Sequence, residues 1–499
     1  MAKATQFTVH PALGGLDISS DATILDPNFL TVADNIEYLE GGQRKKRRGT
    51  LQYSASSSMA GTFANVMVTS SSNVRGIKDY WRYGNTITPV QQYVAVTGAS
   101  IFRSTGDGRW AAVTVSSSFG SNAVNGHGDA YMTVAQDYMV ISDGVAQPVA
   151  YDMATTSLRT PSTGRNWPVF EAHSYHLSRL FTVLTTAPSS ILYMAAGNIF
   201  DSTGSDTGTI PIEVGDGDRV IGISKPFYGS IYIFKGPQKG SVHQLSGNTP
   251  ATFARVQVAH GAPLLDAHAL VSTPTDIYWL SEYGIHSLQT TVKFGNVEQA
   301  FLSLPIQRLW RDGILNRSDL ENSAGFWNPT RNIVGWIVTP TGFSGSGSRS
   351  WILVYNYALS DPKPGGKKFW SIWKLSGYGA VSVDVMLNPS NVASPFQPTH
   401  QGEPHLYIGG DNGLVYQADW TTLCDDLLPY TAQVTTPIIT KWPTPGQALP
   451  ETQEKIVHGV VTYFNPVGNQ SAATMDVVVD GRTQTKTFSL AASDGDVLG

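Results

Sequence analysis

Short runs of apolar residues dominate this chain, and most of them are too short for helices. Runs rich in Val, Ile, Tyr, Phe and Trp are bounded by Gly, Asp, Ser and Pro, which is the pattern of strands joined by turns. One stretch differs, because apolar residues recur at helical spacing in residues 300–314, with Pro305 suited to a first turn and Gly313 to a stop. The pattern predicts an all-β chain with one short helix.

A strand–turn–strand unit recurs along the chain. The copies are YVAVTGASIFR (93–103), YMVISDGVAQPVAY (138–151), LFTVLTTAPSSILYM (180–194), IYIFKGPQKGSVHQL (231–245), IYWLSEYGIHSL (277–288), WILVYNY with FWSIWKL (351–375) and LYIGGDNGLVYQAD (406–419). The first five start 45, 42, 51 and 46 residues apart, close to the roughly 40–50 residues of a propeller blade. A β-sandwich with accidental spacing is the alternative. The regular steps favour a β-propeller with irregular blades.

Two regions lie outside this repeat. We predict an N-terminal arm with a basic hairpin at residues 1–60, a β-propeller at residues 61–429 and a C-terminal β-rich domain at residues 430–499. The last of these contains further strand-like runs, among them KIVHGVVTYF, TMDVVVDG and QTKTFSL.

Composition narrows the class of protein. Hydrophobic residues make up 41% of the chain and charged residues 14%, which argues against a coiled coil and against disorder. The net charge of −5 disfavours a basic nucleic-acid binder at the level of the whole chain. The one cysteine, Cys424, excludes an internal disulfide framework and a cysteine-based zinc cluster. No apolar stretch predicts a membrane span or a signal peptide, so we expect synthesis and folding in a cytoplasm.

Catalytic and nucleotide-binding motifs are missing from the sequence. There is no G-x-x-x-x-G-K-[ST], G-x-G-x-x-G, G-x-S-x-G or H-E-x-x-H pattern in a suitable context. His173 lies near His176, and His260 near His268, but neither pair has organised carboxylate or cysteine partners. We interpret them as turn or partly buried histidines rather than metal ligands. We therefore predict a protein that is not an enzyme, with no catalytic, cofactor or metal site.

Two acidic turns and one loop motif are further candidate sites. Asp143–Gly144 and Asp216–Gly217–Asp218 are better explained as tight turns than as calcium loops, which need more ligands at fixed spacing. The stretch from Ser104 to Trp110 resembles the aspartate box of sialidase-type propellers, in one imperfect copy. That box is a hairpin turn and not a catalytic element.

One strongly charged segment stands out. Five consecutive residues hold 5 of the 33 positive charges, and without them the net charge of −5 would be −10. A chance match to a nuclear-localisation pattern, a solvated hairpin arm, and a clamp on phosphates or an acidic partner are the three interpretations. The candidate contact residues are Arg44, Lys45, Lys46, Arg47 and Arg48.

The N-terminal stretch resembles the start of bacteriophage tail nozzle proteins, the tail tubular protein B and packaged-DNA-stabilisation group of short-tailed phages. The matching elements are Gly14, Gly15, Leu16 and Asp17, then Pro27, Asn35-Ile36-Glu37-Tyr38, and Arg44 to Gly49. Stretches similar to later parts of that family follow in order, among them residues 219–247, 260–289 and GGDNGLVYQAD. The resemblance covers nearly the whole chain, but the large insertions of some members are lacking.

The resemblance implies a structural protein of the virion tail that is assembled in the cytoplasm of a host bacterium. Six copies would form a ring below the portal and adaptor rings, retain the packaged DNA and provide the conduit for its ejection. Tail fibre or tail tip proteins would be further partners, and double-stranded DNA would pass through the lumen without sequence specificity. The basic run would contact the adaptor ring or DNA.

Two other functions stay open at this point. One is a phage propeller that binds or hydrolyses host surface glycans, as sialidases do, which is motivated by the Ser104–Trp110 stretch. The other is a cytoplasmic propeller scaffold for protein partners.

Overall fold

The structure is a computed structural model. It describes residues 14–21, 25, 29–39, 44–53, 73–82, 90–98, 100–104, 110–113, 129–159, 167–289, 301–342, 349–361, 366–387, 403–418, 424–425, 428–429, 432–435, 443–444, 447–448, 472–479 and 482–489.

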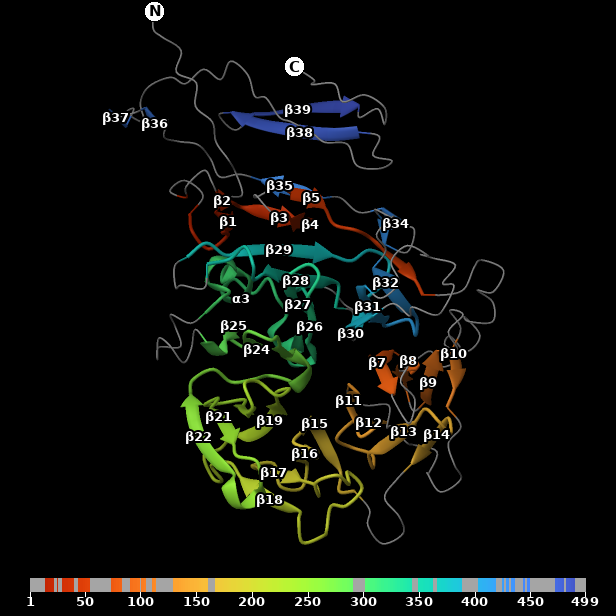
Figure 1. Ribbon diagram of the computed structural model, residues 1–499. Coiled ribbons are helices and arrows are strands. Elements are labelled where there is room, and N and C mark those ends of the chain that lie inside the picture. The colour runs from red at the N-terminus through yellow and green to blue at the C-terminus, as the bar shows by residue number, and fades with distance from the viewer. Residues whose placement is uncertain are drawn as a thin grey trace, which may run out of the picture. The chain divides into compact units, whose positions relative to one another are not determined.

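Seven sheets in the described part of the chain form the blades of a β-propeller, and consecutive strands within each blade pair antiparallel (Figure 1). Blades 1 and 2 contain β7 (Val74–Arg82), β8 (Val90–Thr97), β9 (Ser100–Ser104) and β10 (Trp110–Ala112), then β11 (Tyr131–Ala135), β12 (Tyr138–Ser142), β13 (Val149–Asp152) and β14 (Ser157–Arg159). Blades 3 and 4 contain β15 (Phe170–His176), β16 (Arg179–Leu184), β17 (Ser190–Tyr193) and β18 (Gly208–Pro211), then β19 (Arg219–Ile223), β20 (Ile231–Gly236), β21 (Val242–Ser246) and β22 (Ala254–Ala259).

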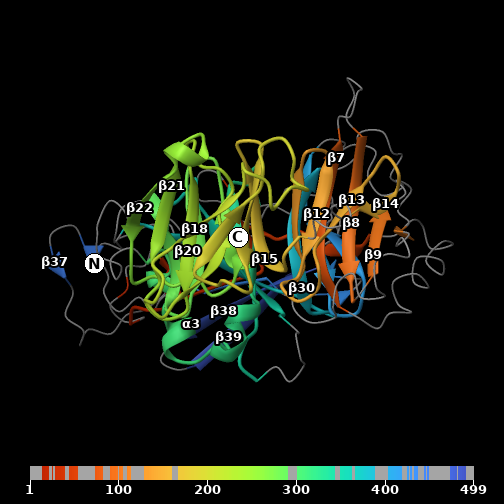
Figure 2. The same ribbon diagram turned by 90° about the horizontal axis from the view of Figure 1, so that it is seen from below.

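The remaining three blades are less regular. Blade 5 contains β23 (Leu270–Ser272), β24 (Ile277–Ser281) and β25 (Gly284–Ser287). Blade 6 begins with β26 (Ala324–Asn328), β27 (Ile333–Val338), β28 (Trp351–Asn356) and β29 (Phe369–Lys374), and blade 7 with β30 (Ala380–Leu387), β31 (Pro404–Gly410) and β32 (Val415–Ala418). The propeller predicted from the repeat is confirmed, and Figure 2 shows strands of blades 1 to 4 standing side by side.

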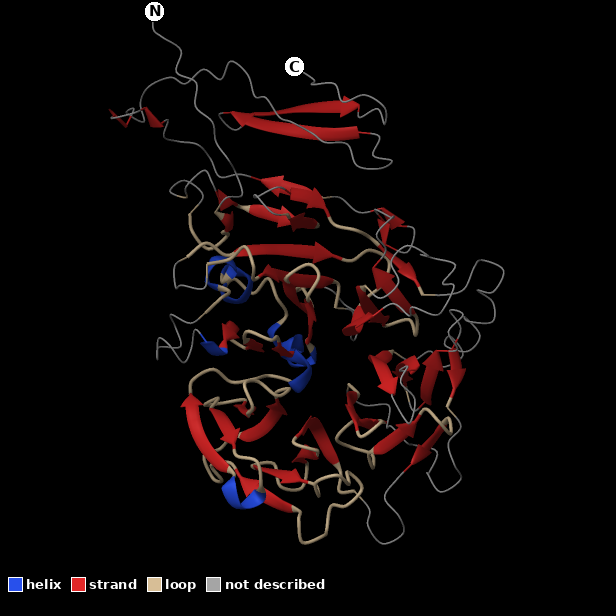
Figure 3. Ribbon diagram, in the orientation of Figure 1, coloured by secondary structure: helices blue, strands red, loops and turns tan. Residues whose placement is uncertain are grey.

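The first strand of each blade forms the inner side of the ring. β7 packs against β11, β11 against β15 and β15 against β19, while β26 packs against β23 and β30. The ring closes because β30 also packs against β7. Between blades 4 and 5 a short helical turn, η3 (Ala267–Ala269), contacts both β19 and β26. Figure 3 shows helical turns on the inner side of the ring.

The apolar core lies mainly between neighbouring blades. Tyr80 and Val94 of blade 1 pack with Met139 and Tyr151 of blade 2, and the same alternation of apolar side chains continues from blade to blade. Strands that are buried on both faces explain the nearly continuous apolar runs seen in the sequence.

The repeat units correspond to strands two and three of each blade, with one exception. The unit at 351–375 lies one strand further along its blade, because it matches β28 and β29, the third and fourth strands of blade 6. The second and third strands, β27 and β28, are separated by a longer connection. A long connection hides the hairpin from a search for tight turns.

The helix predicted at 300–314 is shorter in the structure than expected. Phe301 forms a bridge with His286, and the Leu302 backbone N–H donates to the Ile285 carbonyl at 2.9 Å. Residues 301–302 therefore pair with the outer strand of blade 5, β25, before the helical structure begins. The helical part consists of η5 (Leu304–Ile306) and α3 (Arg308–Arg311), and Gly313 ends it with a φ of 67°.

The N-terminal segment is woven into the propeller. Its strands are β1 (Gly15–Leu16), β2 (Phe29–Leu30), β3 (Val32–Asp34), β4 (Ile36–Tyr38), β5 (Arg44–Lys46) and β6 (Thr50–Gln52). β3 lies between β29 and β35 (Gln433–Thr435) and extends blade 6. β6 pairs antiparallel with β32 and supplies the fourth strand of blade 7, beyond which lie β33 (Cys424–Asp425) and β34 (Leu428–Pro429).

The compact units differ from the predicted domains. Residues Thr8–Ile439 form one unit, so the expected boundary between an arm at 1–60 and a propeller at 61–429 does not separate two bodies. The other unit includes Thr440–Gly499, ten residues later than predicted. In it β38 (Ala472–Val479) pairs antiparallel with β39 (Arg482–Ser489), and β36 (Pro443–Thr444) pairs with β37 (Gln447–Ala448). The predicted strand KIVHGVVTYF lies outside the described residues.

Candidate functional site

The basic run forms one strand of a hairpin and the turn after it. β4 pairs antiparallel with β5, which places Lys45 opposite Glu37. The Lys45 Nζ lies 3.4 Å from Glu37 Oε2, and Glu37 also contacts Arg331. Burial lowers the pKa of Arg44. The hairpin is thus partly covered by the propeller and is not an arm projecting into solvent.

Arg47 lies in the interior. Its side chain is 1% exposed, and that of its partner Asp425 is 0% exposed. Its Nη1 donates to Asp425 Oδ1 at 2.9 Å, its Nη2 to Asp425 Oδ2 at 2.5 Å and to the Lys374 carbonyl at 2.9 Å, and its Nε to Asn35 Oδ1 at 3.0 Å. The interpretation of Arg47 as a contact for DNA or a ring protein is therefore wrong, because its guanidinium is enclosed and occupied.

The other members of the run remain candidates. They are all half-buried, so each presents part of its side chain to solvent, and their role in binding stays a prediction. They are Arg44, Lys45, Lys46 and Arg48.

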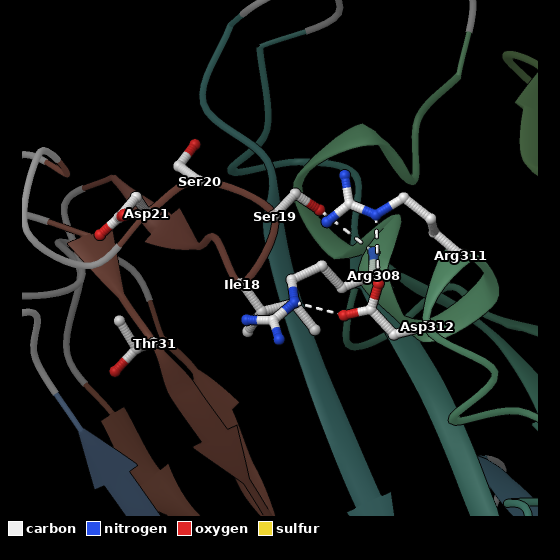
Figure 4. Close-up of a pocket in the computed structure, with 8 residues that line it drawn as sticks. All are labelled: Ile18, Ser19, Ser20, Asp21, Thr31, Arg308, Arg311 and Asp312. Carbon is white, nitrogen blue, oxygen red and sulfur yellow. Dashed lines mark hydrogen bonds and ion pairs between the residues drawn. The ribbon is translucent and has the colours of Figure 1, made fainter.

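A polar pocket lies between the N-terminal segment and α3 (Figure 4). It has a volume of about 520 Å³. Arg308 Nε and Arg311 Nε donate to the two oxygens of Asp312 at 2.8 and 3.1 Å, and these hydrogen bonds lower the pKa of Asp312. Asp21 also lines the pocket, beside Ile18, Ser19, Ser20 and Thr31. Two guanidinium groups and two carboxylates balance here, so the pocket offers no excess charge for a phosphate backbone.

A second polar group of residues, here named the inner cluster, gathers where several blades meet. Its members are Arg75, Asp129, Tyr131, Asp143, Asp266, His268 and Arg349. Arg349 Nη1 lies 3.7 Å from Asp129 Oδ2, and Arg75 Nη2 lies 3.6 Å from Asp143 Oδ2. Burial, the largest influence, raises the pKa of Asp129.

The linker between blades 4 and 5 reaches blade 2 in the inner cluster. The Asp266 carboxylate accepts hydrogen bonds from the His268 backbone N–H at 2.7 Å and from the Tyr131 hydroxyl at 3.1 Å, and it lies 2.9 Å from His268 Nδ1. His268 Nε2 lies 3.2 Å from the Ala130 carbonyl. The imidazole stacks on the Tyr131 ring with centroids 4.1 Å apart. These contacts join parts of the ring that are not neighbours in blade order.

Further charges of both signs lie on the inner strands. Lys78 of β7 lies 3.0 Å from Asp384 of β30. The positive charge of Lys78, followed by burial, lowers the pKa of Lys225, which lies just after β19. Lys78 and Asp384 therefore form a compensated pair between the inner strands of blades 1 and 7.

The histidines of the two predicted pairs lie in different surroundings. His173 is buried, with Nδ1 3.2 Å from Ser142 Oγ and Nε2 3.3 Å from the Val140 carbonyl, and burial lowers its pKa to about 4. His260 is exposed. His268 differs from expectation, since it has an organised carboxylate partner, Asp266. No group of three or more metal-ligating side chains occurs among the described residues.

The acidic turns act as turns, as predicted. Asp143 Oδ1 accepts the backbone N–H groups of the next loop residues at 3.0 and 2.8 Å, while Asp216 pairs with the buried Lys235 at 2.6 Å. Asp218 accepts three backbone N–H groups of residues 238–240 at 2.7 to 2.9 Å. In the Ser104–Trp110 stretch the two end residues pair across β9 and β10, and residues 105–109 lie outside the described part of the chain.

Sequence reasoning missed the inner cluster and the role of Arg47. An Asp-x-His pattern at 266–268 was visible in the sequence, but its partners on blade 2 lie more than 130 residues away. Arg47 could not be told from its basic neighbours, because Asp425 is 378 residues distant.

The described residues define a seven-bladed β-propeller that is closed by an N-terminal strand. No family model matches the sequence, and no curated protein matches it. Solved structures that match include BamB from Moraxella catarrhalis, with 9% identity, TM-score 0.35, and coverage of 65% of this chain and 81% of that chain. PorZ of the type-IX secretion system of Porphyromonas gingivalis matches with 10% identity, TM-score 0.34, and coverage of 72% and 46%.

A computationally designed protein, Ika8, matches with 8% identity, TM-score 0.34, and coverage of 69% and 83%. These similarities are low, and the assignment of the fold rests on the seven sheets of the chain itself. No helix in the described part of the chain is long and apolar enough to cross a membrane.

Proposed function

We propose that this chain is a non-enzymatic structural protein of a phage tail, one subunit of a nozzle ring that retains packaged DNA and provides its exit path. The observation that carries the proposal is the ordered series of nozzle-like sequence elements, which begins at Gly14–Asp17 and runs through to the last blade. Six copies would form the ring, and the neighbouring adaptor and tail fibre or tip proteins would be its partners.

The first support is that the residues of the N-terminal resemblance share one structural task. Gly15 has a φ of 83°, and a Cβ there would lie 2.1 Å from the Lys368 carbonyl oxygen. Asp17 Oδ1 accepts the Ser19 backbone N–H at 2.9 Å, and the Tyr38 hydroxyl donates to the Trp370 carbonyl at 3.1 Å. Gly15 and Tyr38 thus hold the N-terminal segment against blade 6, while Asp17 fixes the turn that follows β1.

The second support is electrostatic. Each phosphate that a protein neutralises adds affinity and slows release, so a conduit for DNA should hold few unpaired cations. Arg47 is enclosed, Lys45 faces Glu37, and Lys78 faces Asp384. The chain as a whole is charge-poor and slightly acidic. Paired charges of this kind suit passage of DNA better than tight binding.

Electron microscopy of the purified full chain, combined with mass photometry, tests the proposal. We expect closed rings with six times the mass of one chain, and the same rings in tail particles. A protein that stays monomeric at all concentrations and is absent from virions would contradict it. Release of reducing sugar from capsule or lipopolysaccharide would instead favour the glycan-processing function, and recovery of cell proteins without ring components would favour the scaffold.

A further inference from the structure

The two nitrogens of His268 both face acceptors. Nδ1 lies 2.9 Å from a carboxylate oxygen of Asp266, and Nε2 lies 3.2 Å from the Ala130 carbonyl oxygen. A neutral imidazole carries one N–H and can donate to only one of them. Both contacts are hydrogen bonds only when the ring carries two N–H groups and a positive charge.

We propose that His268 is a proton-dependent clasp, which ties the linker between blades 4 and 5 to the first strand of blade 2 and loosens when the imidazole loses a proton. The clasp joins segments that are not adjacent in the ring. Tyr131 is the first residue of β11 and Ala130 lies just before it, whereas Asp266 caps η3. Loss of one proton removes either the ion pair with Asp266 or the hydrogen bond to Ala130.

The surroundings of the imidazole favour the charged form. The Tyr131 ring stacks against it and its hydroxyl holds Asp266, which orients the carboxylate toward Nδ1. Asp129 adds negative charge from the start of blade 2. The other titratable or charged groups that face this region are Arg349 from blade 6, Arg75 from blade 1, Asp143 from blade 2, and Glu171 and His173 from blade 3.

Together, the groups around His268 raise the pKa of its imidazole. Burial, the largest influence, lowers the pKa of His268, but the hydrogen bond and charge of Asp266, the charge of Asp129 and the Ala130 carbonyl together raise it above its usual value of 6.5. The reciprocal effect outweighs burial at Asp266, whose pKa is lowered. The clasp is thus fully formed below pH 6.5, and its stabilisation is lost as pH rises through the pKa of the folded protein.

The linker held by the clasp is part of the core. Leu264 and Ala269, on either side of Asp266 and His268, are buried. A Cβ on Gly222 of β19 would approach Leu264 and Ala267 within 3.3 Å, so the linker sits tightly against blade 4. Weakening of the clasp would therefore loosen the inner ends of blades 2 and 4 together, without unfolding their outer strands.

Hydrogen–deuterium exchange of the full chain at pH 6 and pH 9, corrected for intrinsic rates, tests the clasp. We expect protection of residues 264–270 to fall about tenfold for each pH unit by which the pKa of His268 exceeds 6.5. His268→Gln, which cannot change charge, should remove this dependence. His260→Gln, at an exposed histidine, is the matched control and should behave as the unmodified protein does.

A second measurement keeps the test independent of a variant that folds poorly. The imidazole proton resonance of His268, assigned through Asp266→Asn, should titrate above pH 6.5 in the unmodified protein and lower in the variant. A titration at or below pH 6.5, or equal loss of protection in His268→Gln and the unmodified protein, would overturn the clasp.

Discussion

Replacing Arg47 by Met is expected to destabilise the propeller strongly. The substitution keeps most of the side-chain volume but removes the two charged hydrogen bonds to Asp425 and those to Asn35 and to the carbonyl of Lys374. Among the described residues, Asp425 would keep the Thr50 hydroxyl at 3.1 Å and the Ser376 backbone N–H at 3.2 Å. A carboxylate that is 0% exposed and has lost its cation costs about 3–5 kcal/mol.

Urea unfolding followed by tryptophan fluorescence measures this loss. The signal is suited to the site, because the Trp373 indole donates to the Ile36 carbonyl at 2.9 Å beside the closing strands. We expect a lower midpoint with an unchanged slope, which indicates lost stability without a changed denatured state. Lys45→Met is the matched control: it removes one charge from the same run, at a side chain that is 30% exposed, and should cost less than about 1 kcal/mol.

The double variant Arg47→Met/Asp425→Leu separates the pair from its surroundings. Removing both charges removes the unpaired carboxylate, so most of the stability should return. The reasoning would be refuted if Arg47→Met unfolded at the same urea concentration as Lys45→Met, or if the double variant lost the sum of the two single effects.

Three further predictions follow from the same structure. Gly15→Ala should lower the free energy of unfolding by about 2 kcal/mol or more, because the added Cβ would meet the Lys368 carbonyl. Gly197→Ala is the control, since Gly197 also has a positive φ but nothing lies within 4 Å of its Cβ position; it should cost only about 1 kcal/mol. Equal losses in the two variants, measured by equilibrium unfolding, would contradict this reasoning. Burial lowers the pKa of His173 to about 4 and of His286 to about 3. The free energy of unfolding should therefore fall as pH drops below 6.5, by about 2 kcal/mol per histidine at pH 5. A flat profile of unfolding free energy against pH would disprove this. Removing the remaining basic side chains while Arg47 is kept should impair ring assembly or DNA retention but leave the unfolding midpoint nearly unchanged, and full infectivity with filled heads would argue against a contact role. The variant carries Arg44→Ala, Lys45→Ala, Lys46→Ala and Arg48→Ala.

The propeller could be predicted from sequence because its signal is local. A hairpin such as 231–245 contains two buried strands and the turn between them, so its pattern is complete within fifteen residues. Blade closure could not be predicted in this way. β6 is three residues long, too short for any periodicity, and its partner strand lies at the other end of the propeller.

The candidate site was harder to predict than the fold. Among the five adjacent basic residues, Arg47 is the one that pairs with a fully buried carboxylate, that of Asp425. Asp425 lies beyond β32 in the sequence, so its pairing with Arg47 cannot be read from local spacing. The inner cluster likewise depends on which blades face one another. Charge and spacing identify candidate residues for binding or catalysis. Burial decides whether their side chains act inside the fold or on its surface.

The closing strand also fixes the order of events during synthesis. Arg47 and Asp425 are 378 residues apart, and a ribosome that adds roughly 5–20 residues per second needs roughly 20–75 s to cover that distance. Until β32 has been made, β6 has no edge to join, and blade 7 lacks its fourth strand. Completion of the ring is therefore a late, long-range step, and the nascent chain must keep its N-terminal strands from pairing elsewhere until the last blade emerges.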